Sequence, residues 1–172
     1  MNNLFDIADS NSKITAINDS FSTYTGILVS KIKETVEKEA KDFIKKYPFT
    51  HSIKFSVGTY YDDQDYSDVE VRSVYAHIIY DNREIPISAE ESESCWEDIL
   101  IYRPVTQEQD AYNEKVSEWM SENRELVEKF NSDLYSFYML LKSINIILLE
   151  KAYEQSTIEI TANGIEEYAY EY

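Results

Sequence analysis

The sequence has few of the residues on which common catalytic and cofactor-binding motifs depend. Its 172 residues include three glycines, three prolines, two histidines and one cysteine. Gly26, Gly58 and Gly164 lie far apart, which excludes the phosphate-binding loops that need clustered glycines so that the backbone can approach a phosphate. The single cysteine, Cys95, excludes an internal disulfide and fits a reducing compartment.

Further absences exclude other classes of protein. His51, His77 and Cys95 do not have the spacing of a zinc motif, so ordinary strand histidines are the favoured interpretation. The most apolar stretch, Leu134–Leu149, contains a lysine and an asparagine and is shorter than the roughly 20 apolar residues of a membrane span. The N-terminus has neither the basic region nor the long apolar run of a signal peptide. We therefore expect a soluble, cytoplasmic protein with no cofactor and no metal.

Negative charge is what the sequence has in abundance. The chain holds 33 acidic and 16 basic residues, a net charge of −17, with a hydrophobic content of 43% that is typical of a folded domain rather than of a disordered chain. Residues 1–54 hold eight lysines and seven acidic residues, whereas residues 55–172 hold 26 acidic and eight basic residues. Such a surface attracts cationic partners and disfavours direct binding to nucleic acid.

Hydrophobic spacing predicts a single α+β domain over residues 1–172 that begins with a long helix. Residues 1–18 are weakly patterned, and we expect a loosely ordered arm with a short strand near Ile14–Ile17. A helix is predicted from Ser20 to Tyr47, capped by Asp19 or Ser20 and ended by Pro48. Its predicted buried face consists of Phe21, Tyr24, Leu28, Ile32, Val36, Ala40, Phe43 and Tyr47.

Alternating residues then predict an antiparallel β-meander of about four strands, at 51–60, 69–80, 85–88 and 99–102, with a turn at 81–84. Two further helices should follow. Thr106 and Gln109 have the spacing of a capping box, which opens a helix to about Phe130, and residues 134–153 are apolar nearly all round, as in a central buried helix. Asn163-Gly164, between strand-like residues 157–162 and 165–170, predicts a C-terminal β-hairpin.

The helix after Thr106 carries a row of acidic residues on the face opposite its apolar one. The members of this row are Asp110, Glu114, Glu118 and Glu122, with Glu125 beside them. Like charges four residues apart destabilise a helix by a few tenths of a kcal/mol per pair. Such a row therefore indicates either plain solubility or a partner that neutralises it, and it can present a phosphate-like series of charges to lysines and arginines.

Three other acidic runs contain no basic residue. The first comprises Asp62, Asp63, Asp65, Asp68 and Glu70, the second Glu90, Glu91, Glu93, Glu97 and Asp98, and the third Glu159, Glu166, Glu167 and Glu171. Tyr61 and Tyr66 accompany the first run. Carboxylates supply long-range attraction and aromatic rings supply anchors at an interface, so the first two runs join the helical row as candidate partner-binding residues. Read as an EF-hand loop from Asp63, the first run lacks the glycine at position six and the glutamate at position twelve, which favours a solvated loop over a calcium site.

In overall character the chain resembles the small phage-encoded inhibitors that mimic nucleic acid, of the anti-restriction and anti-CRISPR type. The resemblance depends on high acidity without disorder, on the row from Asp110 to Glu122, and on the predicted hairpin Tyr75–Ser88 that leads directly into Glu90–Glu93. It implies a protein that is not an enzyme. Such a protein would block the basic groove of a nucleic-acid-binding enzyme, for example a CRISPR or restriction nuclease, by presenting a DNA- or RNA-like surface.

Other interpretations stay open at the level of sequence. An immunity protein that neutralises a basic nuclease toxin would carry a similar charge. A small metal-binding module or enzyme is a second alternative, and an acidic surface that only keeps the protein soluble is a third. Whether the leading helix forms a homodimer is also left open.

Overall fold

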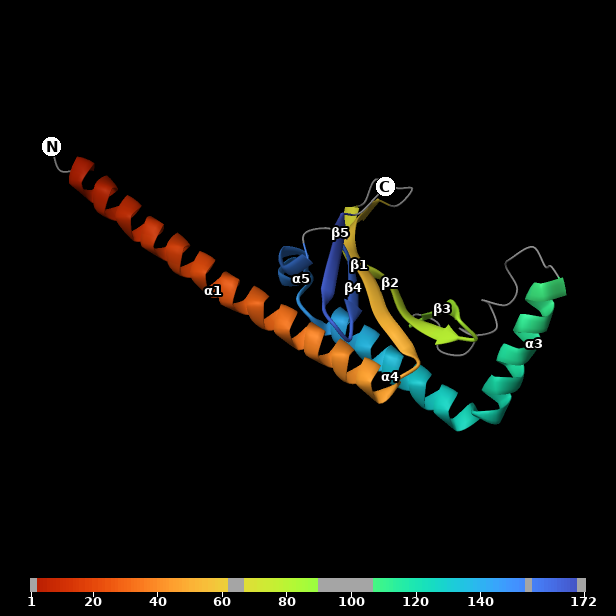
Figure 1. Cartoon of the computed structure of the whole chain (residues 1–172). Coiled ribbons are helices and arrows are strands. Elements are labelled where there is room, and N and C mark those ends of the chain that lie inside the picture. Colours follow the sequence, from red (N-terminus) through yellow and green to blue (C-terminus); the bar gives the residue numbers. More distant parts are fainter. Residues whose placement is uncertain (1–2, 62–66, 90–106, 154–155, 170–172) are drawn as a thin grey trace.

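The computed structural model describes residues 3–61, 67–89, 107–153 and 156–169, and its fold is α+β (Figure 1). The long N-terminal helix and the C-terminal hairpin are both present. In chain order the elements are α1 (Asn3–Lys46), β1 (Thr50–Tyr61), β2 (Ser67–Tyr80), β3 (Arg83–Ser88), α3 (Gln107–Glu122), α4 (Arg124–Ser143), α5 (Ile146–Tyr153), β4 (Ser156–Thr161) and β5 (Ile165–Ala169).

The described strands form one five-stranded antiparallel sheet in the order β3-β2-β1-β4-β5. Asp81 and Asn82 join β2 to β3 with positive φ angles of 48° and 60°, the conformation that a two-residue hairpin turn requires. The C-terminal hairpin is closed differently, because the Thr161 hydroxyl accepts the backbone N–H groups of Asn163 and Gly164 at 3.2 Å. These strand predictions are confirmed, and the predicted strand at 99–102 lies outside the described residues.

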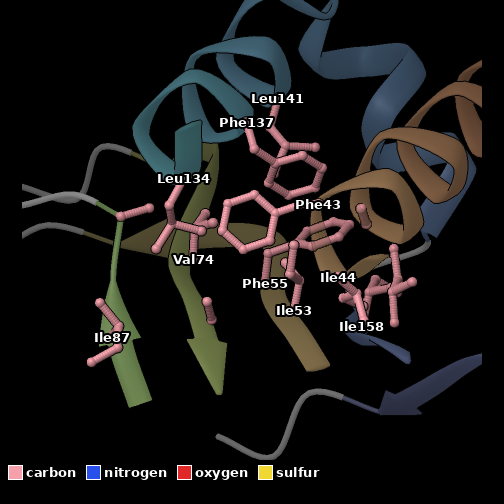
Figure 2. Close-up of a cluster of buried hydrophobic side chains, with 14 of the residues drawn as sticks. Phe43, Ile44, Ile53, Phe55, Val74, Ile87, Leu134, Phe137, Leu141 and Ile158 are labelled. Carbon is pink, nitrogen blue, oxygen red and sulfur yellow. The ribbon is translucent and has the colours of Figure 1, made fainter. Parts of the chain in front are cut away.

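One face of the sheet and the helices share a hydrophobic core (Figure 2). Alternation along β1 turns Ile53 and Phe55 inward and the intervening Lys54 to the other face. Phe43 of α1 contacts Phe130 of α4 at a ring-centroid distance of 5.1 Å, with the rings edge to face. The helices supply the remaining core side chains from their inner faces, chiefly Val36, Ala40, Tyr47, Leu134, Phe137, Leu141, Leu149 and Tyr153.

The first half of α1 differs from the prediction. The helix begins at Asn3, so the expected loose arm with a strand near Ile14–Ile17 is wrong, and Asp19 and Ser20 lie inside the helix rather than at its cap. Every side chain from Ser10 to Tyr24 is exposed, and in Figure 1 this half of α1 projects away from the sheet. The predicted apolar face is therefore buried only from Val36 onward, and Phe21 and Tyr24, which were predicted to be part of it, are 66% and 63% exposed.

The chain from Gln107 to Tyr153 forms three helices where two were predicted. The first helix ends at Glu122 and not near Phe130, because the chain breaks at Asn123, whose side chain donates to the Trp119 carbonyl at 2.8 Å. A second break comes at Asn145, whose Oδ1 accepts the first free N–H groups of α5 and so caps that helix. Of these helices, α4 and α5 pack on one face of the sheet through one side only, so the expectation of a helix buried all round is also wrong. The large apolar side chains that they leave exposed are Leu126, Tyr135, Met139 and Ile147.

Candidate interaction surface

Helix α3 is held at the end of the β2–β3 hairpin by its apolar face. Tyr112 and Val116 are buried and Trp119 is half-buried. The Tyr112 hydroxyl donates to the Tyr80 carbonyl at 3.1 Å, and the Tyr80 hydroxyl donates to the Lys115 carbonyl at 3.2 Å. The Tyr80 ring also contacts the Trp119 ring at 5.7 Å. These contacts fix how α3 is rotated about its own axis, and hence which face it presents to solvent.

The face of α3 that points to solvent carries the predicted acidic row. Glu114, Glu118 and Glu122, here called the α3 carboxylate row, are all exposed. None of the three has a hydrogen-bond or ion-pair partner among the residues that the structure describes. With a rise of about 1.5 Å per residue, successive members are about 6 Å apart along the helix axis. The one basic residue of α3, Lys115, is 3.4 Å from Asp81 Oδ2, so it does not neutralise the row.

The other predicted partner-binding residues are placed elsewhere or are not described. Asp110 lies on α3, whereas Glu125 is exposed on α4, beyond the break at Asn123. Tyr61 ends β1, and Asp68 lies near the start of β2. Glu70 lies on β2 and pairs with Arg72 at 2.8 Å. The remaining predicted positions lie outside the described residues; they are Asp62, Asp63, Asp65, Tyr66, Glu90, Glu91, Glu93, Glu97 and Asp98.

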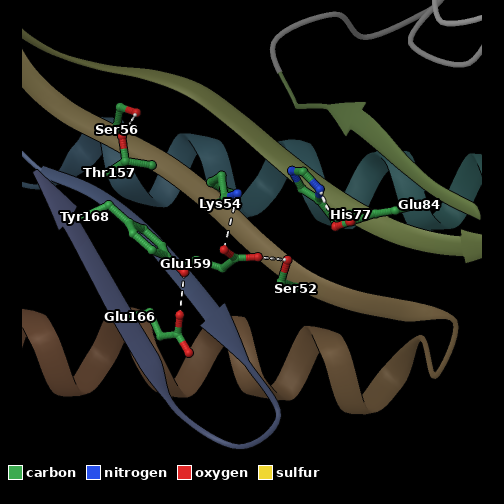
Figure 3. A network of polar contacts seen from close by, with 9 residues as sticks. All are labelled: Ser52, Lys54, Ser56, His77, Glu84, Thr157, Glu159, Glu166 and Tyr168. Atoms are coloured by element: carbon green, nitrogen blue, oxygen red, sulfur yellow. Dashed lines mark hydrogen bonds and ion pairs between the residues drawn. The ribbon is translucent and has the colours of Figure 1, made fainter. Parts of the chain in front are cut away.

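Two acidic residues of the C-terminal hairpin, Glu159 and Glu167, are neutralised by lysines from the first third of the chain. On the face of the sheet shown in Figure 3, Glu159 accepts a hydrogen bond from Ser52 at 2.8 Å and forms an ion pair with Lys54 at 3.2 Å. Glu167 pairs with Lys33 of α1 at 3.0 Å. Burial alone would raise the pKa of Glu159, but the bonds from Ser52 and Lys54 outweigh it and lower that pKa. Two members of the third acidic run, Glu159 and Glu167, therefore already have cationic partners. Within the described residues, Glu166 accepts a hydrogen bond only from the Tyr168 hydroxyl.

A groove of about 440 Å³ lies between α1 and α4. It holds Asp133, which accepts a hydrogen bond from Tyr47 at 2.6 Å and pairs with Lys46. Burial would raise the pKa of Asp133, yet the bonds from Lys46 and Tyr47 lower it overall. The acidic residues farther along the groove, Glu39 and Asp42, both pair with Lys38. Each charged group of the groove thus already has a partner, which leaves little to bind a charged ligand.

The two histidines lie on neighbouring strands. His51 is exposed on β1, and His77 on β2 has its Nδ1 2.7 Å from Glu84 Oε1. The described ranges contain no group of three or more histidine, cysteine or acidic residues arranged to hold a metal ion. Nor does any helix within those ranges combine the length and hydrophobicity needed to cross a membrane.

Sequence reasoning missed one exposed surface, on the first half of α1. Ile14 and Ile17 are 55% and 66% exposed, and they continue the line of Phe21 and Tyr24 along the helix. The signal was present in the spacing of three, four and three residues between these positions. It was lost because Ile14 and Ile17 were assigned to a strand, and because the aromatic pair was assigned to the core.

Comparisons with known proteins do not assign the chain to a family. No protein-family model matches it, and neither a search of curated proteins nor a search of solved structures returned a match.

Proposed function

We propose that this protein is a non-catalytic inhibitor that occupies the basic nucleic-acid-binding groove of a nuclease, in a CRISPR or restriction-type defence system. The observation that supports this most is the α3 carboxylate row, three exposed carboxylates without partners in the described structure on a helix fixed by the sheet. Elsewhere, lysines of α1 and β1 neutralise the acidic residues that they reach. The row is therefore a place where several neighbouring carboxylates on one helix face are left for a partner.

The spacing of the row suits a groove that binds a nucleic-acid strand. Its carboxylates follow one another about every 6 Å along the helix axis, whereas one DNA strand carries a charge about every 3.4 Å of its axis. The row thus matches roughly every second phosphate. Lysines and arginines that hold such phosphates would meet a carboxylate at a comparable interval.

The position of the row also costs the free protein some stability. Glu114, Glu118 and Glu122 form like-charge pairs four residues apart, and no basic residue lies in the last turn of α3. A cationic partner would relieve this repulsion on binding, whereas solubility alone could be achieved at positions where charge is not destabilising.

The test is inhibition of DNA cleavage by two purified enzymes, an RNA-guided DNA nuclease and a type I restriction endonuclease. We expect inhibition of at least one at near-equimolar protein, relieved by excess DNA, and weaker at about 300 mM than at about 50 mM NaCl because exposed charges are screened. The variant E114Q/E118Q/E122Q should lose inhibition at least about tenfold. The control variant E34Q/E39Q/D42N removes the same number of charges from α1 and should inhibit like the wild type.

Three results would contradict the proposal. One is equal loss of inhibition in both variants, which would show that only net charge matters. Another is a ternary complex in which the nuclease holds DNA and this protein together. The third is neutralisation of a small basic nuclease toxin with no effect on either defence enzyme, which would favour the role of an immunity protein.

A further inference from the structure

We propose that the first half of α1 is a dimerisation arm that pairs, antiparallel, with the same segment of a second copy of this chain. The surface that it uses, here called the arm seam, consists of Ile14, Ile17, Phe21, Tyr24 and Leu28.

The arm seam has the spacing of a two-helix coiled coil. Its members are separated by three, four, three and four residues, the repeat that keeps one apolar stripe facing a partner helix. The first four side chains are between 55% and 66% exposed, and Leu28 is half-buried where the arm meets the body. A continuous stripe of this kind is therefore left uncovered by the rest of the described chain.

The composition of the arm indicates that it needs a partner in order to stay helical. In residues 10–30 only Lys13, Ala16 and Leu28 are strong helix formers, and the rest are mainly serine, threonine, asparagine and β-branched or aromatic residues. A helix of that composition is marginal in water when no tertiary contact supports it. Residues 31–46, by contrast, are rich in lysine and glutamate and pack on the body through Val36, Ala40 and Phe43.

Charge selects a second copy as the occupant of the seam. Residues 10–30 contain one basic and one acidic residue, Lys13 and Asp19, in a protein whose net charge is −17. Two arms can therefore meet without repulsion, whereas two bodies cannot approach closely. An antiparallel pair places the two bodies at opposite ends of the joined arms, which keeps their charges apart. An anionic lipid surface would repel the same body.

One antiparallel register pairs the four exposed members of the seam with one another. With residue 19 at its centre, Ile14 faces Tyr24 of the second copy, and Ile17 faces Phe21 of the second copy. A buried aromatic side chain covers about 150–250 Å², so these side chains together would remove on the order of 1,000 Å² from water, the size at which specific interfaces begin. In Figure 1, α3 lies at the end of the molecule remote from the arm, so the dimer would leave both α3 carboxylate rows accessible.

Sedimentation velocity of the full chain tests the dimer. At tens of micromolar we expect a mass of about 40 kDa, twice that of the 20.2 kDa chain. The variant I17E/F21E should sediment as a monomer. The matched control A16E/S22E adds the same two charges at exposed positions off the seam and should remain a dimer. The tryptophan bands of the near-UV circular dichroism spectrum should be the same for all three proteins, because both tryptophans lie outside the arm.

A distance measurement tests the antiparallel arrangement. A spin label at Ser30→Cys, in a Cys95→Ser background, should give a separation of about 33 Å along the axis, because the label lies 11 residues from the centre in each copy. A parallel pair would instead bring the labels to about 10 Å, the usual distance between packed helices, and would overturn the arrangement proposed. A wild-type monomer, or a dimer that survives I17E/F21E, would overturn the dimer itself. Sedimentation of the monomer with phosphatidylcholine vesicles would identify lipid as the occupant instead.

Discussion

Replacing the three carboxylates of the α3 row by amides should make the protein more stable, although we expect it to abolish binding. E114Q/E118Q/E122Q keeps the size and helix propensity of each side chain nearly unchanged. It removes two like-charge pairs four residues apart, Glu114–Glu118 and Glu118–Glu122, each unfavourable by about 0.2–0.5 kcal/mol.

The expected gain in the free energy of unfolding is therefore about 0.4–1 kcal/mol in low salt. For a chain of this size that corresponds to a rise in Tm of about 1–4 °C. Urea denaturation of both proteins at about 20 mM and about 1 M NaCl measures this gain in stability. The gain should be smaller at about 1 M NaCl, where the Debye length is about 3 Å and the charges are screened. The comparison variant E34Q breaks the exposed pair between Lys31 and Glu34, 2.5 Å apart, and should lose a few tenths of a kcal/mol.

A triple variant that is less stable than the wild type would refute this reasoning. It would mean that the carboxylates make stabilising contacts in the free protein, and the α3 carboxylate row would then not be available to a partner. A gain that is the same in low and high salt would point to helix propensity rather than charge as its cause.

Two further predictions concern the body of the protein. Asp133→Asn should lower the free energy of unfolding by about 1–2 kcal/mol at pH 7, because the hydrogen bonds to a charged acceptor from Lys46 and Tyr47 are weakened. The pKa of Asp133 is lowered in the folded state, so the stability that its carboxylate contributes is complete above the unfolded pKa near 4 and is lost as the pH falls through the folded pKa. In urea titrations, the difference in free energy of unfolding between the wild type and Asp133→Asn should therefore be smaller at pH 3 than at pH 7. Asn145→Ala should cost about 1 kcal/mol by uncapping α5, whereas Asn145→Ser should retain most of the stability. Loss of the cap in Asn145→Ala should speed hydrogen exchange at the amides of Ile147 and Leu148, and unchanged protection there would contradict the capping role.

Local periodicity was sufficient for the strands and for the acidic row. The alternation of Ile53, Phe55 and Val57 identifies β1 and its buried face without knowledge of any other element. The same holds for Glu114, Glu118 and Glu122, because helix geometry alone places residues four apart on one face. For these features the sequence-based prediction and the structure agree.

Features that depend on distant parts of the chain could not be predicted in this way. Periodicity marks Phe21 and Tyr24 as members of an apolar face, but it does not say whether the same chain covers them. The lysines that neutralise Glu159 and Glu167 are more than 100 residues away in sequence, at Lys54 and Lys33. The helix breaks at Asn123 and Asn145 carry neither proline nor glycine. Asparagine is a favoured helix cap, but it also occurs inside helices, so its presence alone did not locate these breaks.

The position of β1 at the centre of the sheet has a consequence for how the chain reaches its folded state. β1 pairs on one side with β2, which follows it closely, and on the other with β4, where Ser52 lies opposite Thr161. During synthesis, therefore, β1 keeps one unpaired edge until almost the whole chain has emerged, and the closing contact is one of long sequence separation, which slows folding. An edge of this kind is a template for pairing with other chains. Loss of the last hairpin would accordingly release an aggregation-prone sheet rather than a slightly shortened protein.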